Sequence, residues 1–309
     1  MSTLRLGTRG SALALWQAHH VAALLAELPA APKVEIIEIK TAGDVALDTP
    51  LWKTAGKGFF TAELDRALSE GEIDLAVHSL KDLPTKMVAG LQLAAVPERE
   101  DSHDALVCGA GIDADKLPPG ATIGTSSLRR RAFIARWRKD IAHRELRGNV
   151  PTRVGKVDAG SYDAIVLAVA GLKRLGLAAR ISKVLPFDTF PPAVAQGALG
   201  LMTRADDATT SSIVRKLDDA PSRIAVTAER VLLQHLEGGC QIPLGAIAYL
   251  DGDALMLAAQ VCALDGSNSI SVEKRGAAAN PEGLGIALAE ELISRGAHEI
   301  LKAGAVQAS

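Results

Sequence analysis

A lysine and an aspartate follow an apolar run directly, in a segment whose residue types suit acid–base or charge-stabilising chemistry. The run Ile73–Val77 predicts a buried strand, and it leads into the segment 78–84 (HSLKDLP). The carboxyl end of a strand in an α/β sheet is the usual place for a ligand crevice. There Lys81 supplies a cation for a substrate, and Asp82 a carboxylate for proton transfer or for facing a developing positive charge. The alternative is that Asp82 only organises the turn before Pro84.

An arginine-rich stretch, Thr125–Arg153, predicts an anion-binding function. It contains nine Lys or Arg and two acids, a net charge of +7, so the remainder of the chain carries −9. Arg129 and Arg130 lie just after Ser127, where a strand is expected to pass into a helix. At the start of a helix, hydroxyls, free backbone amides and guanidinium groups can bind carboxylates or phosphates. The alternative is a solvated helix face, and it accounts well for Arg136, Arg138 and Lys139.

Two further arginines of this stretch are harder to explain as a solvated face. Arg147 precedes Gly148 and Asn149, and Arg153 falls in the first turn of an expected helix. A cation at the start of a helix opposes the helix dipole. A ligand is therefore the favoured reason for Arg147 and Arg153.

One cysteine stands apart from the other two. Cys240 lies in Glu237–Pro243 (EGGCQIP), where two glycines remove steric cover around the sulfur, so that a large group can approach it. Cys108 and Cys262 lie inside apolar strand-like runs, which is typical of inert core cysteines. Three cysteines that are far apart, with no C-x-x-C pair, disfavour a disulfide framework or a structural zinc site.

A fourth group of polar residues follows the first two expected strands. Arg9-Gly10-Ser11 lies at the first strand-to-helix turn, and Lys40–Asp44 (KTAGD) follows the second strand. Both positions are comparable to that of Asp82. We therefore expect Arg9, Ser11, Asp44 and Lys81 to gather around one cleft, with Ser11 also capping the helix that follows it.

Composition narrows the class of protein. The 309 residues suggest two or three domains, and 48% hydrophobic residues are ordinary for a chain with a buried core. A net charge of −2 and only 10 Phe, Trp or Tyr residues exclude a chain-wide basic surface or stacking platforms for nucleic acid. No apolar run is long enough for a membrane span, and the N-terminus has no signal-peptide pattern, so we expect a cytoplasmic protein. The chain has no complete phosphate-loop, dinucleotide or metal-ligand motif, which disfavours a nucleotide or metal enzyme.

Hydrophobic periodicity predicts two α/β series and then a different C-terminal region. Before Pro97, strands and helices alternate, which implies a parallel or mixed sheet covered by helices. A second series of the same kind follows Pro97. After Pro221, we expect a long helix to Leu236, three strands with antiparallel pairing, and one helix from about Pro281 to Leu301.

Six motifs follow one another in order along almost the whole chain. They are 7–11 (GTRGS), 40–44 (KTAGD), 78–84 (HSLKDLP), 124–130 (GTSSLRR), 146–150 (LRGNV) and 238–241 (GGCQ). Any one of them would be a weak signal, but six in register are highly specific. Together they resemble the porphobilinogen deaminase (hydroxymethylbilane synthase) family.

The resemblance implies a three-domain fold. Two periplasmic-binding-protein-like (type II) α/β lobes, joined by two crossovers, hold the active site between them, and a small C-terminal α+β domain has a three-stranded antiparallel sheet. The expected domains are 1–97 with 198–216, carrying the catalytic Asp; 103–192, carrying the Arg-rich carboxylate site; and 220–309, carrying the attachment Cys.

The resemblance also implies the reaction. Such an enzyme condenses four porphobilinogen molecules head to tail with release of ammonia, and then hydrolyses the linear tetrapyrrole hydroxymethylbilane from a covalent dipyrromethane primer. The primer is joined by a thioether to Cys240, and neither a metal nor a nucleotide is implied. The family implies a cytoplasmic monomer that passes its product to uroporphyrinogen-III synthase, with no nucleic-acid or membrane partner.

Carried over motif by motif, the resemblance assigns site residues. Asp82 is the catalytic carboxylate, which assists loss of the amino group and stabilises the azafulvenium cation. The residues implied to bind substrate and cofactor carboxylates are Arg9, Ser11, Lys81, Thr125, Ser127, Arg129, Arg130, Arg147, Arg153 and Arg174. Asp44 and Gln196 are further cleft residues, and a mobile loop contains Lys53, Lys57 and Phe60. The sequence departs from the family at Ala195, where glycine is frequent, and at Phe133, where a polar residue is common.

Two alternatives come from other classes of protein. A two-lobed cytoplasmic module of the same fold would bind a polycarboxylate without catalysis, and the lack of an export signal argues against it. An RNA-binding protein would use the basic stretch, but the aromatic residues and the domain-wide charge excess are missing.

Overall fold

The computed structural model describes residues 3–41, 61–236 and 242–308, with side chains up to residue 302. The chain divides into two compact units. Unit 1 comprises Met1–Glu100 and Ala198–Arg223, and unit 2 comprises Asp101–Gly197 and Ile224–Ser309.

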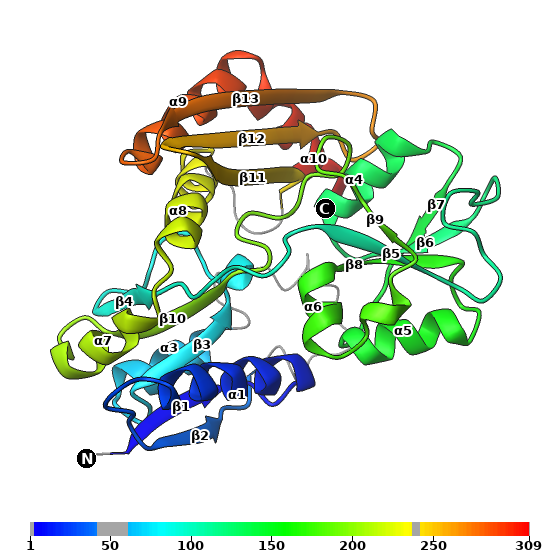
Figure 1. The fold of residues 1–309 in the computed structure, drawn as a ribbon. Coiled ribbons are helices and arrows are strands. Elements are labelled where there is room, and N and C mark those ends of the chain that lie inside the picture. The colour runs from blue at the N-terminus through cyan, green and yellow to red at the C-terminus, as the bar shows by residue number, and fades with distance from the viewer. Residues whose placement is uncertain (1–2, 42–60, 237–241, 309) are drawn as a thin grey trace. The chain divides into compact units, whose positions relative to one another are not determined.

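Unit 1 contains a mixed five-stranded sheet with the order β2-β1-β3-β10-β4 (Figure 1). Its strands are β1 (Leu4–Thr8), β2 (Val34–Glu38), β3 (Leu75–Ser79), β4 (Leu91–Ala95) and β10 (Leu199–Arg204). The strand β1 is parallel to β2 and β3, whereas β10 is antiparallel to both β3 and β4. The carboxyl ends of β1 and β3 therefore lie at the same edge of the sheet.

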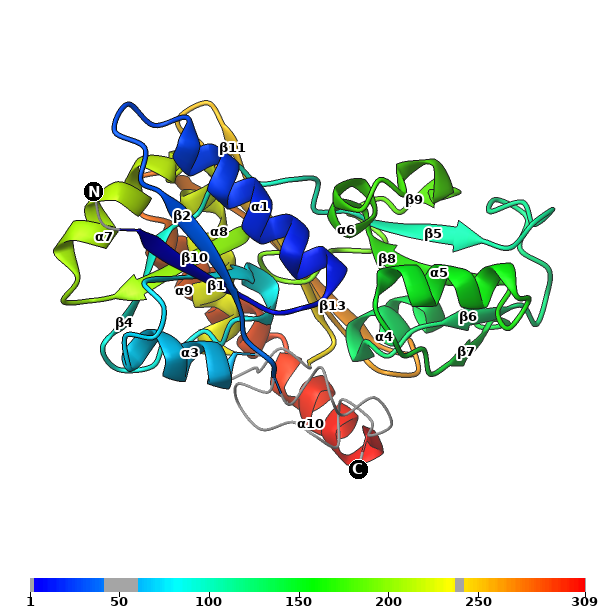
Figure 2. The ribbon, with the colours of Figure 1, turned by 90° about the horizontal axis from the view of Figure 1, so that it is seen from below.

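Helices cover both faces of this sheet. The helices of unit 1 are α1 (Ala12–Ala26), α3 (Ala62–Ser69) and α7 (Ala208–Val214), with short 3-10 turns η1 (Leu80–Asp82) and η3 (Arg215–Leu217). Figure 2 shows α1 lying across β1 and β2, and its buried Val21 and Leu25 pack on Leu6, Leu75 and Val77 of the sheet. The expected serine cap is confirmed, because the side chain of Ser11 accepts a hydrogen bond from the backbone N–H of Ala14.

Unit 2 contains a second mixed five-stranded sheet, with the order β7-β6-β8-β5-β9. Its strands are β5 (Asp104–Cys108), β6 (Thr122–Gly124), β7 (Ala142–Arg144), β8 (Ala164–Ala168) and β9 (Lys183–Val184). Here β6 is parallel to β7 and β8, and β5 is antiparallel to β8 and β9. The carboxyl ends of the three parallel strands and the start of β5 thus share one edge.

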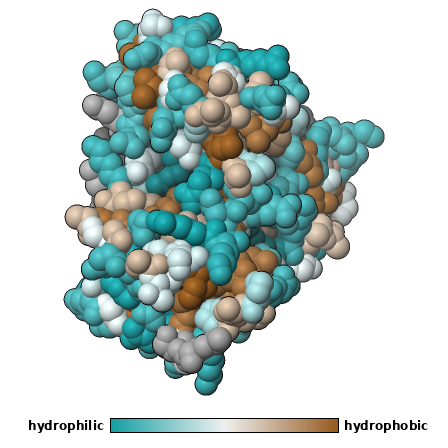
Figure 3. Space-filling model, turned by 60° about the vertical axis from the view of Figure 1, so that its left-hand side comes forward, coloured by the Kyte–Doolittle hydropathy of each residue, from teal (hydrophilic) through white to brown (hydrophobic). Residues whose placement is uncertain are grey.

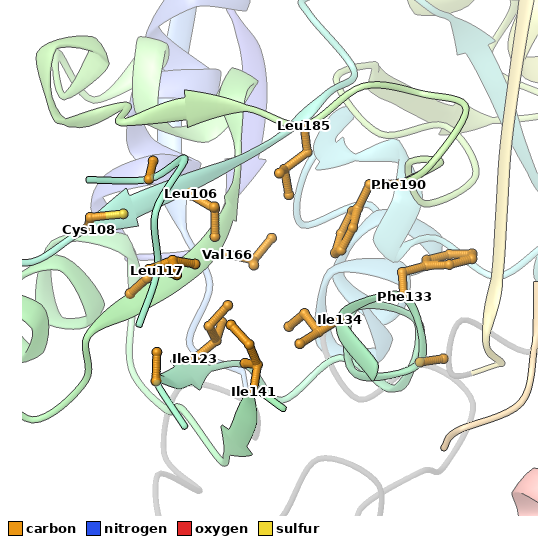
Figure 4. Packing of buried hydrophobic residues seen from close by; sticks show 14 of the residues in the cluster. Leu106, Cys108, Leu117, Ile123, Phe133, Ile134, Ile141, Val166, Leu185 and Phe190 are labelled. Atoms are coloured by element: carbon orange, nitrogen blue, oxygen red, sulfur yellow. The ribbon is translucent and has the colours of Figure 1, made fainter. Parts of the chain in front are cut away.

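Both faces of this second sheet are buried. Successive residues of a strand point to opposite faces, and consecutive residues of β5 and β8 are buried. The covering elements are α4 (Leu128–Trp137), α5 (Val150–Asp158), α6 (Val169–Arg174) and the 3-10 turn η2 (Ala178–Arg180). On one face, Leu106 and Val166 pack with Phe133 and Ile134 of α4 and with Phe190 (Figure 4). The opposite face, with β5 and β8 residues such as Val107 and Leu167, packs against α5 and α6.

The C-terminal region forms a three-stranded antiparallel sheet with the order β11-β12-β13 (Figure 1). Its elements are α8 (Ala220–His235), β11 (Leu244–Asp251), β12 (Ala254–Cys262), β13 (Ser269–Ala277), α9 (Pro281–Ser294) and α10 (Ala297–Ala308). The predicted fold class of two α/β sheets followed by a small α+β region with three antiparallel strands is therefore confirmed. The expectation of one helix over 281–301 is wrong, because Gly296 adopts a left-handed conformation (φ +93°) that ends α9 and separates it from α10.

The antiparallel sheet shares a core with the second α/β sheet. Cys262 and Leu264, at and just beyond the end of β12, belong to the same buried cluster as Phe133 and Phe190. At the same contact, Gly266 lies so close to the backbone of α4 that a Cβ atom there would meet Arg136 N at 2.4 Å. This shared core explains why both sheets fall into unit 2.

The face shown in Figure 3 is largely hydrophilic, with apolar patches between the polar residues. Over the described residues, the exposed large hydrophobic side chains are Val88, Val184, Tyr249 and Ile286. None of the described helices has the length and apolar character needed to cross a membrane.

Candidate active-site residues

The structure places four predicted site residues at one edge of the unit 1 sheet. Arg9 and Ser11 directly follow β1, and Lys81 and Asp82 follow β3, its parallel neighbour. Asp82 is the last residue of the 3-10 turn η1. The backbone N–H of Leu80, at the start of this turn, donates a hydrogen bond to Ala198 O at 3.0 Å. The side chain of Asp82 is exposed, so this carboxylate can be approached from solvent.

A buried glutamine supports the same turn from the helix side. Gln17 on α1 is 3% exposed, and its Nε2 atom donates a hydrogen bond to Ser79 Oγ at 2.8 Å. Ser79 is the last residue of β3 and directly precedes η1. The contact therefore fixes the place where the strand passes into the segment that carries Lys81 and Asp82.

His78, in the same motif, is held in its neutral form. Its side chain is 5% exposed, and Nε2 has no hydrogen-bond partner among the described residues. Burial, together with the charge of Arg9, lowers the pKa of His78 to about 4. At neutral pH this imidazole therefore carries no charge, and it does not titrate where a general base has to work.

In unit 2, predicted site residues follow each of the three parallel strands. Thr125 and Ser127 follow β6, and both hydroxyls serve the local turn. Thr125 Oγ1 accepts from Ser127 N at 3.2 Å, and Ser127 Oγ caps α4 by accepting from Arg130 N at 3.4 Å. The remaining arginines follow the neighbouring strands, Arg147 and Arg153 after β7 and Arg174 after β8.

Arg129 and Arg130 are buried around one carboxylate, that of Asp104 at the start of β5. Arg129 Nη2 lies 2.6 Å from Asp104 Oδ2, and Arg130 Nη2 lies 2.6 Å from Asp104 Oδ1. The three residues are 4%, 7% and 0% exposed, respectively. Burial alone would raise the pKa of Asp104, but the charges and hydrogen bonds of the two guanidinium groups outweigh it and lower that pKa. Asp104 is therefore a carboxylate anion in the folded protein.

This buried cluster has one more positive than negative charge. Arg129 Nη1 donates to Pro191 O at 2.6 Å, and Arg130 Nη1 donates to Val166 O at 2.8 Å. The Nε atoms of both arginines are buried and have no acceptor in the part of the chain that the structure describes. A buried donor without an acceptor is costly, and a buried charge needs a counter-charge. The geometry therefore suits an anionic ligand.

The other predicted arginines are held mainly by backbone carbonyls. Arg153 Nε donates to Gly148 O at 2.7 Å, and Arg174 Nη2, on a side chain 9% exposed, donates to Gly197 O at 2.7 Å. Arg147 lies 3.6 Å from Glu145 in a weak ion pair. The interpretation as a solvated helix face is confirmed for Arg136, which is exposed on α4. Lys139 is exposed but lies beyond the end of α4, and half-buried Arg138, at that end, pairs with Asp140 at 2.6 Å.

The segment 195–197, where the chain leaves unit 2, is held by hydrogen bonds to buried polar groups. Ala195 has φ +58°, the left-handed conformation, which non-glycine residues seldom adopt. Its N–H donates to Glu229 Oε2 at 2.6 Å, and Glu229 Oε1 accepts from Ala248 N at 2.8 Å. Gln196 Nε2 donates to Ser102 O (2.9 Å) and Asp104 Oδ1 (3.0 Å). The turn that usually takes glycine is therefore formed here by an alanine.

Several predicted site residues lie outside the described residues. They are Asp44, Lys53, Lys57, Phe60 and Cys240. Conversely, two buried acids that support the site were missed by the sequence analysis. Asp104 holds Arg129 and Arg130, and Glu229 holds the 195–197 turn. For Asp104 a signal was present, because an acid that opens an otherwise apolar strand is rarely buried without a cation.

The interpretation of Cys108 and Cys262 as core residues is confirmed, since both are buried and neither forms a disulfide. Burial raises the pKa of Cys108, and it raises the pKa of Cys262 to about 11. The thiolate is the reactive form of cysteine, and with a raised pKa it is scarce at neutral pH.

We expect both thiols to resist alkylation in the native protein. At pH 8 only about one in a thousand Cys262 side chains is a thiolate, and this fraction rises about tenfold per pH unit toward pH 11. Peptide mapping after iodoacetamide treatment at pH 8 should show Cys108 and Cys262 unmodified, and modified once the chain is denatured. Rapid native labelling of Cys262 at pH 8 would contradict the burial described here.

Comparison with known proteins decides the family. Residues 4–212 match the family model described as porphobilinogen deaminase, dipyromethane cofactor binding domain, and residues 223–294 match porphobilinogen deaminase, C-terminal domain. The chain belongs to the porphobilinogen deaminase family. It is accordingly a transferase of tetrapyrrole biosynthesis, which makes hydroxymethylbilane from porphobilinogen and uses a dipyrromethane cofactor.

Three solved structures are similar to part of this chain. A double mutant of the BvgS VFT2 domain from Bordetella pertussis is 17% identical, with a TM-score of 0.40 over 70% of this chain and 86% of that one. A putative lipoprotein from Actinomyces odontolyticus is 17% identical, with a TM-score of 0.42 over 70% of this chain and 89% of that one. A putative periplasmic sulfonate-binding protein, SsuA from Methylobacillus flagellatus, is 14% identical, with a TM-score of 0.37 over 77% of this chain and 68% of that one.

Proposed function

We propose that the buried arginines of unit 2 bind the carboxylate groups of the cofactor and of porphobilinogen in hydroxymethylbilane synthesis. The observation that carries this proposal is the buried excess of positive charge around Asp104. Arg129 and Arg130 each retain a buried Nε–H donor with no acceptor among the described residues. Charge-assisted hydrogen bonds from guanidinium groups are a preferred way to bind carboxylates in proteins. The donor set thus fits dipyrromethane, whose side chains are acetate and propionate.

Cys240 is proposed as the attachment residue. The family match covers both the cofactor-binding and the C-terminal domain, and Cys240 is the cysteine that the GGCQ motif assigns. Cys108 and Cys262 are poor alternatives, because they are buried and their pKa values are raised. When attached, dipyrromethane supplies the pyrrole carbon to which the first substrate unit is added.

Asp82 is proposed as the catalytic carboxylate. It lies exposed at the end of η1, close in sequence to Lys81 and at the sheet edge that also holds Arg9. A carboxylate among cations can stabilise the positive charge that develops on porphobilinogen as its amino group leaves as ammonia. The neighbouring His78 stays neutral near pH 7, so it adds no repulsive charge to that cation.

The remaining assignments follow the family motifs. Proposed carboxylate-binding residues beside the buried pair are Arg9, Ser11, Lys81, Thr125, Ser127, Arg147, Arg153 and Arg174. Gln196 and Asp44 are proposed as further residues of the site, and Lys53, Lys57 and Phe60 as parts of a covering loop. We also propose the three domains 1–97 with 198–216, 103–192 and 220–309. The protein is further proposed to be a cytoplasmic monomer that passes its product to uroporphyrinogen-III synthase.

Replacing Arg147 tests the carboxylate-binding assignment. Arg147→Gln removes the charge but keeps a polar side chain, and we expect the KM for porphobilinogen to rise about tenfold, the size of one lost charge-assisted hydrogen bond. Steady-state kinetics should show a smaller change in kcat. The control is Arg144→Gln, which removes an exposed cation on β7 that packs on the Tyr162 ring at 5.3 Å. Equal KM values for the two variants would contradict the assignment.

A further inference from the structure

Asp104 is a fully buried charged group in the described part of unit 2, and the family motifs give it no role. Asp104 is 0% exposed, and both of its carboxylate oxygens are occupied. Oδ2 accepts from Arg129 Nη2, and Oδ1 accepts from Arg130 Nη2 and from Gln196 Nε2, at 2.6, 2.6 and 3.0 Å. Two consecutive arginines and a glutamine that is distant from them in sequence therefore converge on this one carboxylate.

The contacts fix the orientation of both guanidinium groups. Each one donates one Nη to Asp104 and the other Nη to a backbone carbonyl, that of Pro191 for Arg129 and that of Val166 for Arg130. The Nε–H groups are left as donors without a partner among the described residues. Since a guanidinium is planar and rigid, fixing two of its nitrogens also fixes the direction of the third.

Two phenylalanine rings pack next to one of these arginines, Arg129. The guanidinium carbon of Arg129 lies 5.9 Å from the centre of the Phe190 ring, which is within the range of a cation–π contact. Phe190 packs in turn on Phe133, with the ring centres 5.7 Å apart. Phe133 stands where the family commonly has a polar residue, and in this chain it packs behind the Phe190 ring that lies near the Arg129 guanidinium.

We propose that Asp104 is a positioning residue of the reaction, which presents Arg129 and Arg130 to carboxylates of the substrate and the growing chain. The inference rests on the proposed function of these two arginines. Asp104 neutralises only one of their two charges, so the cluster keeps one positive charge for a ligand. Gln196 ties the same carboxylate to the 195–197 turn, so this turn and the arginine pair share one anchor.

The competing interpretation is a structural ion pair with no effect on the ligand. Unit 1 provides a matched example in Asp74, which also holds two arginines. Asp74 Oδ1 lies 2.7 Å from Arg5 Nη2 and 3.2 Å from Arg204 Nη2, and its side chain is 15% exposed. No family motif assigns Asp74 or these two arginines to the site.

The test compares Asp104→Asn with Asp74→Asn in the full chain. For each variant we would measure the fraction of chains carrying the dipyrromethane mass, the KM and kcat for porphobilinogen, and the melting temperature in a Cys240→Ser background that carries no adduct. Asp104→Asn is expected to slow adduct formation and to raise KM about tenfold, since the arginines lose their orienting anion. Asp74→Asn is expected to lower the melting temperature with unchanged KM and adduct.

A milder substitution keeps the test decisive if Asp104→Asn does not fold. Gln196→Met preserves volume and leaves the Asp104 carboxylate in place, but it removes the hydrogen bonds from Gln196 Nε2 to Asp104 and to Ser102 O, and we expect KM to rise about threefold. Normal KM and normal adduct formation in the folded Asp104 variant, or in Gln196→Met if that variant alone folds, would overturn the inference. A wild-type chain with neither adduct nor turnover would instead overturn the proposed function, so the two failures are distinguishable.

Discussion

The Cys240→Ser variant is expected to lose its covalent adduct and almost all turnover. The purified wild-type chain should be heavier than its sequence by the mass of two linked pyrroles, and the variant should have the mass of the bare chain. A thiolate is a strong nucleophile that forms a stable thioether, whereas a serine hydroxyl is almost never ionised at neutral pH. Without the primer no chain can grow, so we expect activity to fall by at least about 10³-fold.

Neither of the other cysteines can take over this role. Cys108 and Cys262 are 8% and 0% exposed, and burial raises the pKa of both thiols. The matched control is Cys108→Ser, which should keep the adduct and the activity in the chains that fold. Intact-mass spectrometry of wild type and both variants decides the matter. An unmodified yet active wild type, or an adduct that survives in Cys240→Ser, would show that the attachment site has been misassigned.

Local patterns were sufficient to predict most elements of the fold. The apolar run 73–77 overlaps β3, the serine cap of α1 is present, and α4 begins just after Ser127, as the sequence predicted. These signals are local, because a cap or a strand pattern involves residues close in sequence. The α/β order then constrained the topology, since parallel strands need a crossover, which is usually a helix.

Long-range pairing was the part that could not be predicted. The strand β10 lies between β3 and β4, where Leu201 pairs with Val77 and Ala95, more than 100 residues away. Its sequence, LGLMTR, includes a glycine and has no strict alternation, so only the partner strands make it a strand. The break at Gly296 was missed for a related reason, because a single glycine near the end of a helix is either tolerated or a stop signal.

The same distinction applies to the site. Motifs assigned the arginines and Asp82 to the proposed site, but they gave no role to Asp104, which contacts Arg129 and Arg130. Asp104 meets those arginines because β5 is antiparallel to β8, with Asp104 opposite Ala168 at the carboxyl edge of the parallel strands. Similarly, Ala195 stands where the family frequently has glycine, and no local pattern indicates that its N–H meets buried Glu229, a contact that contributes to holding the left-handed conformation.

Replacing Asp82 is expected to stop turnover while leaving the adduct in place. Asp82→Asn keeps the size of the side chain and removes the negative charge that faces the cation formed as ammonia leaves. Loss of one group that stabilises transition-state charge typically costs 10²–10³-fold in kcat. KM should change little, because the proposed carboxylate-binding arginines remain, so the kinetic effect should be the opposite of that of Arg147→Gln.

Asp82→Glu separates charge from position. The carboxylate is retained but displaced by one methylene, and a misplacement of about 1 Å is enough to cost on the order of 10²-fold. We therefore expect kcat to fall strongly in both variants, with intact mass still showing the adduct. The matched control is Asp206→Asn, which removes an exposed carboxylate elsewhere in unit 1 and should leave kcat unchanged. If Asp82→Asn turns over at the wild-type rate, the positive charge must be stabilised by another acid, and the assignment of Asp82 is wrong.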